Sequence, residues 1–144
     1  MPSLSKTSEL YQLAEQEGIP IIHLSFPLCG SVSLQQDNGR CYIGLDDMPI
    51  TQERVHLAHE LGHCLTGSFY NRYSPYDVRA KHEHRADKWA IHRLIPRESL
   101  EQAVAAGRCE LWELAEYFEV TEEFINKAVN LYAPEVNCYA KETC

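Results

Sequence analysis

The segment His59-Glu60-Leu61-Gly62-His63 constrains the fold of this chain more than any other feature. A helix advances about 100° per residue, so side chains four residues apart project from the same face. His59 and His63 can therefore hold one metal ion between their rings, while the Glu60 carboxylate lies beside the open coordination position. The segment predicts a helix that carries a zinc-hydrolase site.

The residues around this motif predict one continuous helix. Pro49-Ile50-Thr51 is expected to form a turn with Thr51 as the N-cap, and Gly67 is expected to end the helix. A glycine inside a helix, such as Gly62, costs ~1 kcal/mol relative to alanine and usually indicates close packing by another segment. The alternative is an amphipathic helix with ordinary histidines, so the metal hypothesis needs a third ligand.

The third ligand cannot come from the extended metzincin pattern, because Thr66 and Phe69 occupy the positions of its glycine and its last histidine. A second predicted helix offers Glu83 instead. Asp87, one turn later on the same face, could accept the free ring N–H of a ligand histidine, and Ala86 would let the two helices pack closely. In the alternative interpretation, Glu83 and Asp87 are solvated charges paired with nearby basic residues. We favour the ligand hypothesis.

The two segments together resemble the ImmA/IrrE family of metallo-endopeptidases. The resemblance covers residues 51–96 and rests on Ala58-His59-Glu60-Leu61-Gly62-His63 with Leu65-Thr66-Gly67, on Glu83-x-x-Ala86-Asp87-x-Trp89-Ala90, and on Leu94-Ile95-Pro96. It implies a gluzincin-like site that binds Zn²⁺ through His59, His63 and Glu83, with Glu60 as the catalytic base. Many members have a second glutamate where this chain has Arg85, and Leu-Leu-Met-Pro where it has Arg93-Leu94-Ile95-Pro96; neither change touches a proposed ligand.

The resemblance also implies a protein substrate, because members of the family often cleave a partner repressor that has a helix-turn-helix domain. Such members are often encoded by phages or integrative elements. These expectations come from the family and not from the residues of this chain.

The predicted reaction is metal-assisted hydrolysis of a peptide bond, with Glu60 taking a proton from water and passing it to the leaving nitrogen. A donor for the developing oxyanion is also needed, and the sequence does not choose among Tyr70, Tyr73, Tyr76, His82, His84 and His92. The alternative function is a catalytically silent metal-site protein that acts as a protein-binding module. Glu60 favours catalysis, because a purely structural zinc site is usually closed by four protein ligands.

Length and composition suit a single domain, residues 1–144. The order of a helix, a small sheet and an active-site helix predicts the α+β class with a minimal zincin-like fold, and the family resemblance implies that it is of the gluzincin type. We expect an N-terminal helix over 6–17, a small three-stranded sheet over 19–26, 32–35 and 41–45, the HExxH helix and the second ligand helix. Asp37-Asn38-Gly39 predicts a hairpin turn. Strand 41–45 is the candidate edge strand for an extended peptide. Within the domain, residues 51–96 hold the metal-site helices, 97–133 a helical C-terminal unit and 134–144 a flexible tail.

The C-terminal unit is expected to contain three helices, over 98–106, 110–118 and 121–132, with Thr121 as an N-cap. Residues 114–121 look like a helix-turn-helix bend. From Cys109 to Ala133, however, six glutamates accompany one lysine, whereas a phosphate-binding module needs clustered basic residues. We therefore expect no nucleic acid as a partner and interpret the unit as a surface for a protein.

Charge and cysteine content bear on the partner and on the compartment. The chain carries a net charge of −8, with −4 over residues 1–50, +2 over 51–96 and −6 over 97–144. The basic residues gather around the predicted site, which favours a polar or acidic peptide. We expect a cytoplasmic protein with no membrane span and no leader peptide, and therefore reduced thiols at Cys29, Cys41, Cys64, Cys109, Cys138 and Cys144.

Overall fold

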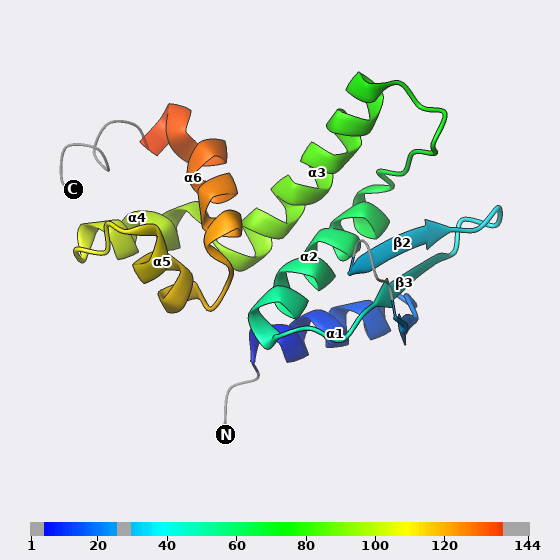
Figure 1. The fold of residues 1–144 in the computed structure, drawn as a ribbon, viewed down its shortest axis with the longest axis horizontal. Coiled ribbons are helices and arrows are strands. Elements are labelled where there is room, and N and C mark those ends of the chain that lie inside the picture. Colours follow the sequence, from blue (N-terminus) through cyan, green and yellow to red (C-terminus); the bar gives the residue numbers. More distant parts are fainter. Residues whose placement is uncertain (1–4, 26–29, 137–144) are drawn as a thin grey trace. The chain divides into compact units, whose positions relative to one another are not determined.

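The computed structural model describes residues 5–25 and 30–136. The chain divides into two compact units, Met1–Ala90 and Ile91–Cys144, and each is described by itself. In the described part of the chain the elements follow one another (Figure 1) as α1 (Lys6–Gln16), β1 (Ile21–His23), β2 (Ser31–Gln35), β3 (Cys41–Leu45), α2 (Ile50–Thr66), α3 (Tyr76–Leu94), α4 (Arg97–Ala105), α5 (Leu111–Phe118) and α6 (Glu122–Val136). The α+β class is confirmed; that the chain is one domain stays a prediction. No helix in the described ranges is long and apolar enough to cross a membrane.

The three strands form a mixed sheet with the order β1-β3-β2. β3 pairs in parallel with β1 (Ile21 opposite Ile43) and antiparallel with β2 (Ser31 opposite Leu45). The prediction that Cys41–Leu45 is an edge strand is therefore wrong. The physical reason is burial: Ile43 and Leu45 have no exposed surface, and an apolar strand is best covered when neighbours pair with it on both sides.

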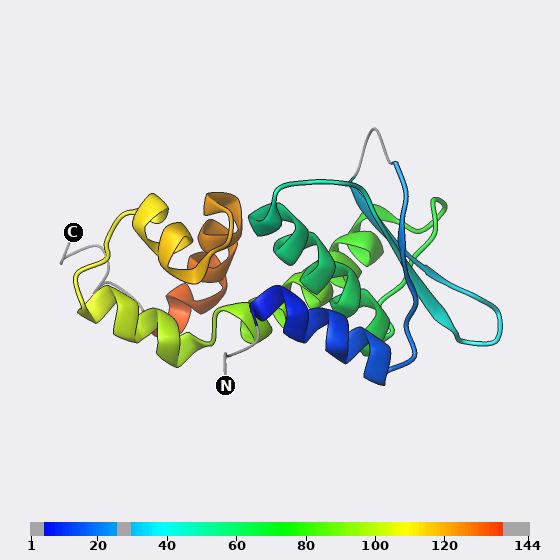
Figure 2. The same ribbon diagram turned by 90° about the horizontal axis from the view of Figure 1, so that it is seen from below.

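The hairpin predicted at Asp37-Asn38-Gly39 is confirmed. It joins β2 to β3, with the Gln36 N–H donating to the Arg40 carbonyl at 2.8 Å and Gly39 at φ +85°. Figure 2 shows this hairpin projecting beyond α1 and α2. Positive φ is accessible to glycine at little cost, which explains why the turn closes at this residue.

Strand β1 is shorter than the predicted 19–26. The Ile19 N–H donates to the Ala14 carbonyl at 2.8 Å and so closes the end of α1 instead of joining the sheet. Pro20 follows, and it has no N–H for a strand ladder. Pairing continues as far as the Leu24 N–H, which donates to the Leu45 carbonyl at 2.8 Å; Phe26 lies outside the described residues.

Helix α2 carries the HExxH motif. Its start differs from the prediction, whereas its end agrees with it. The helix begins at Ile50 with Pro49 as its N-cap, so the prediction of Thr51 as the cap is wrong. The Glu53 N–H already donates to the Pro49 carbonyl at 2.9 Å, so the helix starts before Thr51 and has no side-chain cap. The predicted end is confirmed, since Gly67 has φ +65° and its N–H donates to the His63 carbonyl.

Helix α2 is the central element of the first unit, in contact with α1, β2 and β3, and Figure 1 shows α3 running along its other side. The crossing of α2 and α3 depends on Gly62. A Cβ atom at Gly62 would lie 2.5 Å from the Ala86 carbonyl oxygen, and Ala86 has no exposed surface. The close packing predicted for this glycine is confirmed, and it brings the two metal-site helices together.

Replacing Gly62 with alanine is therefore expected to destabilise the first unit. Overpacking against backbone costs about 1–3 kcal/mol, which exceeds the ~1 kcal/mol that alanine gains in helix propensity. Urea unfolding followed by circular dichroism measures the change, with Gln52→Ala, an exposed position on the same helix, as the control. Equal or higher stability in the Gly62 variant would contradict the close crossing.

The second unit contains α4, α5 and α6, which confirms the three predicted helices. Thr121 caps α6 as predicted, because its hydroxyl accepts the Phe124 N–H at 3.2 Å. Tyr132 is 3% exposed and donates from its hydroxyl to the Ile95 carbonyl at 2.9 Å, which ties α6 to the residue that follows α3. Helix α6 continues to Val136, past the predicted end at Tyr132, and residues 137–144 lie outside the description.

The prediction of reduced thiols is wrong for three cysteines. Cys41 on β3 and Cys64 on α2 form a disulfide with a Cα–Cα separation of 6.0 Å, and Cys109 is disulfide-bonded as well. No local pattern indicates the pair of Cys41 and Cys64, because the two residues are 23 positions apart on different elements. Only the packing of α2 on β3 brings them within reach. This bond joins the metal-site helix to the centre of the sheet.

Candidate metal centre

Helices α2 and α3 bring together the side chains of His59, His63 and Glu83. The two Nε2 atoms of the histidines are 3.2 Å apart. The Nε2 of His59 lies 2.8 Å from Oε2 of Glu83, and the Nε2 of His63 lies 3.3 Å from Oε1 of Glu83. Within the described residues, this group is the one with a composition and spacing suited to holding a metal ion.

The Nδ1 atoms of His59 and His63 make hydrogen bonds that hold the orientation of both rings. Nδ1 of His59 lies 2.7 Å from Oδ1 of Asp87, and Nδ1 of His63 contacts the Ser68 carbonyl. A carbonyl has no proton to give, and an ionised carboxylate has none either, so each Nδ1 carries the proton. In the neutral rings, both Nε2 lone pairs then face the same point near Glu83.

This donor set fits a divalent cation. In a tetrahedral site with bonds of ~2.0–2.1 Å, neighbouring ligand atoms lie about 3.3 Å apart, close to the 3.2 Å between the Nε2 atoms and the 3.3 Å from His63 to Glu83. Two lone pairs and a carboxylate directed at one point repel one another unless a cation lies between them. Three protein ligands also leave a fourth position open, as catalytic zinc sites do.

Glu60 lies beside this group and is 7% exposed. Against the lowering effect of burial, hydrogen bonds to Asp87 and Glu83 raise the pKa of His59. The pKa of Tyr70 is raised mainly by the hydrogen bond to Glu83. The charge of Glu60 adds a smaller increase to both pKa values, so the carboxylate lies within electrostatic range of the metal group. Oε2 of Glu60 accepts a hydrogen bond from the Ser31 hydroxyl at 2.7 Å, and Nδ1 of His56 lies 2.7 Å from the same hydroxyl. Sequence reasoning missed Ser31 and His56, because neither position belongs to the HExxH pattern.

A comparison with protein-family models places residues 14–130 in the IrrE N-terminal-like domain of the peptidase M78 family. The chain belongs to this family. The match covers most of the chain, including both metal-site helices, and confirms the resemblance drawn from residues 51–96. No curated protein and no solved structure shows significant similarity to the chain. The family supplies a metallopeptidase class, and the His59, His63 and Glu83 group supplies the matching site.

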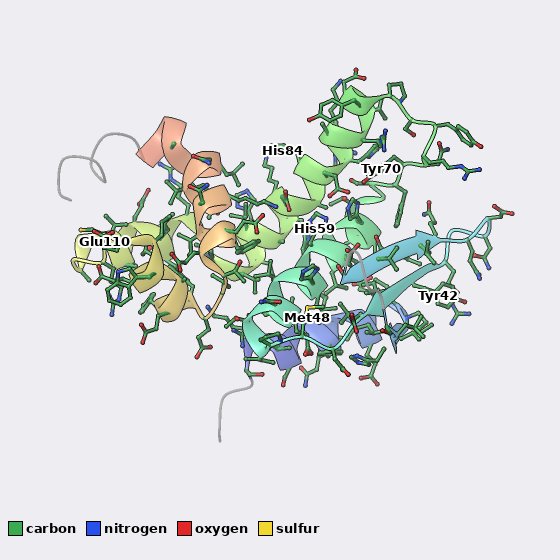
Figure 3. All side chains as sticks on the ribbon, in the orientation of Figure 1. Tyr42, Met48, His59, Tyr70, His84 and Glu110 are labelled. Carbon is green, nitrogen blue, oxygen red and sulfur yellow. A yellow bond between two sulfur atoms is a disulfide. The ribbon has the colours of Figure 1, made fainter. Side chains whose placement is uncertain are left out.

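Among the six candidate oxyanion donors, the structure brings one to the metal group of this peptidase-family chain. The Tyr70 hydroxyl donates to Oε1 of Glu83 at 2.6 Å, and the Tyr70 ring lies 6.4 Å from that of His63. Four of the other candidates lie away from the metal group. Tyr73 and Tyr76 are about four-fifths exposed. His84 is exposed on α3, and His92 faces Tyr132 in the second unit. His82 stacks on Tyr70 at 6.3 Å, and its buried Nδ1 has no hydrogen-bond partner. In Figure 3, Tyr70 and His84 lie on different sides of α3.

Hydrogen bonding within the group shifts several pKa values in the metal-free protein. Burial lowers the pKa of His59, but hydrogen bonds to Asp87 and Glu83 outweigh it and raise the pKa to about 10. Hydrogen bonds from His59 and His63 hold the pKa of Glu83 well below its usual range. The hydrogen bond to Glu83, with burial, raises the pKa of Tyr70 to about 12. Without metal, the group therefore holds a proton where a cation would bind.

This linkage predicts how the metal-free protein responds to pH. The folded pKa of His59 is raised to about 10 from 6.5, so its contribution to stability is fully present below pH 6.5 and lost as pH rises through 10. We therefore expect the melting temperature of the metal-free protein to decrease as the pH is raised from 6.5 to 10. Metal binding near neutral pH should release a proton, measured by calorimetry in two buffers of different ionisation enthalpy. A flat stability profile with no proton release would contradict the assignment.

Proposed function

We propose that this chain is a zinc-dependent endopeptidase that hydrolyses a peptide bond in a protein substrate. The observation that carries the proposal is the convergence of two Nε2 lone pairs and the Glu83 carboxylate, next to a buried glutamate in a chain of the peptidase M78 family. Three protein ligands with an adjacent carboxylate favour a catalytic site over a structural one.

In this proposal His59, His63 and Glu83 hold the ion. A zinc ion held by these three residues would lower the pKa of a coordinated water to ~7 and would polarise the scissile carbonyl. Glu60 takes a proton from the attacking water and delivers it to the leaving nitrogen. Asp87 acts on His59 by fixing its ring orientation and tautomer, and the hydrogen bond of 2.7 Å between them supports this role.

Tyr70 is our candidate for stabilising the oxyanion. Its hydroxyl is the donor among the six candidates that reaches the metal group, and it is 39% exposed, so it can turn from Glu83 toward a bound substrate. A donor aimed at the developing charge is needed for amide hydrolysis. The stacked His82 ring supports Tyr70 in this position.

Strand β2 is our candidate for contact with an extended substrate, in place of β3. β2 pairs with β3 along one side only, and its other edge has no partner strand among the described residues. Its first residue, Ser31, contacts Glu60, so a peptide added to this edge would pass next to the proposed base.

For the substrate we propose a regulatory protein such as a repressor with a helix-turn-helix domain, and for the gene a phage or an integrative element. Such a repressor would place the reaction in the cytoplasm. The Cys41–Cys64 disulfide stands against that location, because cytosolic reductants keep most thiols reduced. Alkylation of thiols at the moment of lysis, followed by mass spectrometry, shows whether Cys41 and Cys64 are reduced, as a cytoplasmic location predicts, or disulfide-bonded.

The test of function is a comparison of metal-free and zinc-restored protein. Each is incubated with native protein extract from the source organism, and new N-termini are identified by mass spectrometry. We expect cleavage in few proteins, present only with zinc, and a helix-turn-helix domain in the protein that is cut. Cleavage that is equal without metal, or absent with metal, would refute the proposal.

A binding module is the second candidate function. Its support is the exposed apolar surface of α5, where Trp112 is 58% exposed, Tyr117 51% and Leu111 40%, among glutamates. Exposed tryptophan and tyrosine side chains such as these are enriched among the residues that contribute most to protein–protein binding. In the extract experiment, a protein retained by zinc-loaded chain but left intact would favour this function.

Replacing Asp87 with alanine tests its proposed support of His59. Partners of metal-ligating histidines typically contribute 10–100-fold to metal affinity, so we expect a loss of about that size. Competition with a chromophoric chelator measures the affinity, and Asp77→Ala, an exposed carboxylate on the same helix, is the control. Unchanged zinc affinity in Asp87→Ala would show that the hydrogen bond does not support the ligand.

A further inference from the structure

The carboxylate of Glu60 is the end of a hydrogen-bonded chain that starts on the same helix. His56 lies one helical turn before Glu60 on α2, and Ser31 lies at the start of β2. The Ser31 Oγ is 2.7 Å from Nδ1 of His56 and 2.7 Å from Oε2 of Glu60. Ser31 is 8% exposed and Glu60 is 7% exposed, so the contact between them is shielded from water.

The direction of these hydrogen bonds follows from counting protons. A serine hydroxyl has one proton, and Ser31 donates it to Glu60. The contact between Ser31 and His56 then requires a proton on Nδ1 of the histidine, because the serine oxygen can only accept there. The chain therefore runs from the His56 ring through the Ser31 hydroxyl to the Glu60 carboxylate.

The backbone next to Ser31 is shaped to admit the His56 ring. Gly30 has φ +75°, and a Cβ atom there would lie 3.3 Å from Cε1 of His56. The Gly30 carbonyl accepts the Asp46 N–H at 2.8 Å, which holds Gly30 against the end of β3. A Cβ atom at residue 30 would press the His56 ring back by a few tenths of an ångström, and the positive φ favours glycine at this position in any case.

We propose that Ser31 and His56 are positioning residues for the general base Glu60, an inference that rests on the proposed peptidase function. A hydrogen bond on Oε2 fixes the rotation of the carboxylate. In the described residues no hydrogen bond engages Oε1, so this second oxygen remains available to a water molecule. The His56 N–H polarises the Ser31 hydroxyl, and hydrogen bonds in a chain strengthen one another. A base held in one orientation avoids the cost of being ordered during each reaction.

The test combines side-chain NMR with kinetics on the full zinc-loaded chain. In ¹⁵N spectra of the imidazoles, Nδ1 of His56 is expected to carry a proton, and Ser31→Ala should shift that proton toward Nε2 and move the carboxyl ¹³C resonance of Glu60. Ser33→Ala on the same strand is the control and should change neither signal. If His56 of the parent protein carries its proton on Nε2 alone, the proposed series of hydrogen bonds is wrong.

The kinetic arm uses the substrate identified in the extract experiment. Ser31→Ala should lower kcat roughly tenfold, the size expected when one hydrogen bond that orients the base is lost, with KM and zinc content unchanged. His56→Ala should cause a smaller loss, and the double variant should be no slower than Ser31→Ala, because the residues act in series. Parental kcat in Ser31→Ala, or losses that multiply in the double variant, would overturn the proposal. If the parent protein cleaves nothing, the proposed function fails. The NMR signals still decide whether the hydrogen bonds from His56 through Ser31 to Glu60 exist.

Discussion

Replacing Glu83 with alanine is expected to remove the metal ion from the purified chain. The parent should retain about one zinc per chain after dialysis against a weak chelator, because three protein ligands meet at one point. The variant keeps His59 and His63 but loses the charged ligand, and two neutral imidazoles bind zinc weakly without it. We expect the affinity to fall by more than the roughly 100-fold that loss of a supporting residue can cause. Elemental analysis of protein without a histidine tag measures the content.

The control for this prediction is Asp77→Ala, which removes an exposed carboxylate from the first turn of the same helix. It should keep the parental zinc content and melting temperature. Zinc should raise the melting temperature of the parent by mass action and leave that of Glu83→Ala unchanged. Equal zinc in parent and Glu83→Ala would show that the ion is held elsewhere, and no zinc in the parent after reconstitution would favour the binding-module function.

The metal group was predictable because it depends on local periodicity. Two histidines four residues apart share a helical face whatever the rest of the chain does. Gly62 predicted a close approach, and Ala86 on the second helix fills that place. Glu83 could be named because it lies on the same helical face as Ala86 and Asp87. These inferences required only the identity of two helices and the faces that they present.

Features that depend on non-local packing could not be predicted. The sequence predicts three strands, but the order β1-β3-β2 follows from which strand is buried on both sides. The Cys41–Cys64 disulfide needs the packing of α2 on that sheet. The partner of His63 is the backbone carbonyl of Ser68, and every residue has a carbonyl, so no side-chain pattern indicates it. Ser31 lies just outside the predicted strand 32–35. The alternation of apolar and polar residues along that strand therefore did not indicate its contact with Glu60.

Replacing Glu60 with glutamine is expected to abolish cleavage while zinc remains bound. Glutamine has nearly the same shape, and its side-chain carbonyl can still accept the Ser31 hydroxyl, so the fold and the metal ligands should be preserved. The amide cannot take a proton from water. General-base catalysis typically contributes 10²–10⁴-fold, and we expect kcat to fall by about that factor. Stopped assays with the identified substrate measure the rate, and elemental analysis confirms the zinc content.

The matched control is Glu53→Gln, also on α2, where the carboxylate accepts the Tyr11 hydroxyl at 2.8 Å. This variant removes one negative charge from the same helix, as Glu60→Gln does, so it separates the loss of a base from the loss of charge. It should keep the parental kcat. A Glu60→Gln enzyme that cleaves at the parental rate with zinc bound would show that another group removes the water proton. A Glu60→Gln enzyme that loses zinc would instead show that the carboxylate supports metal binding, and the role of Glu60 as the base would then need a different test from its activity.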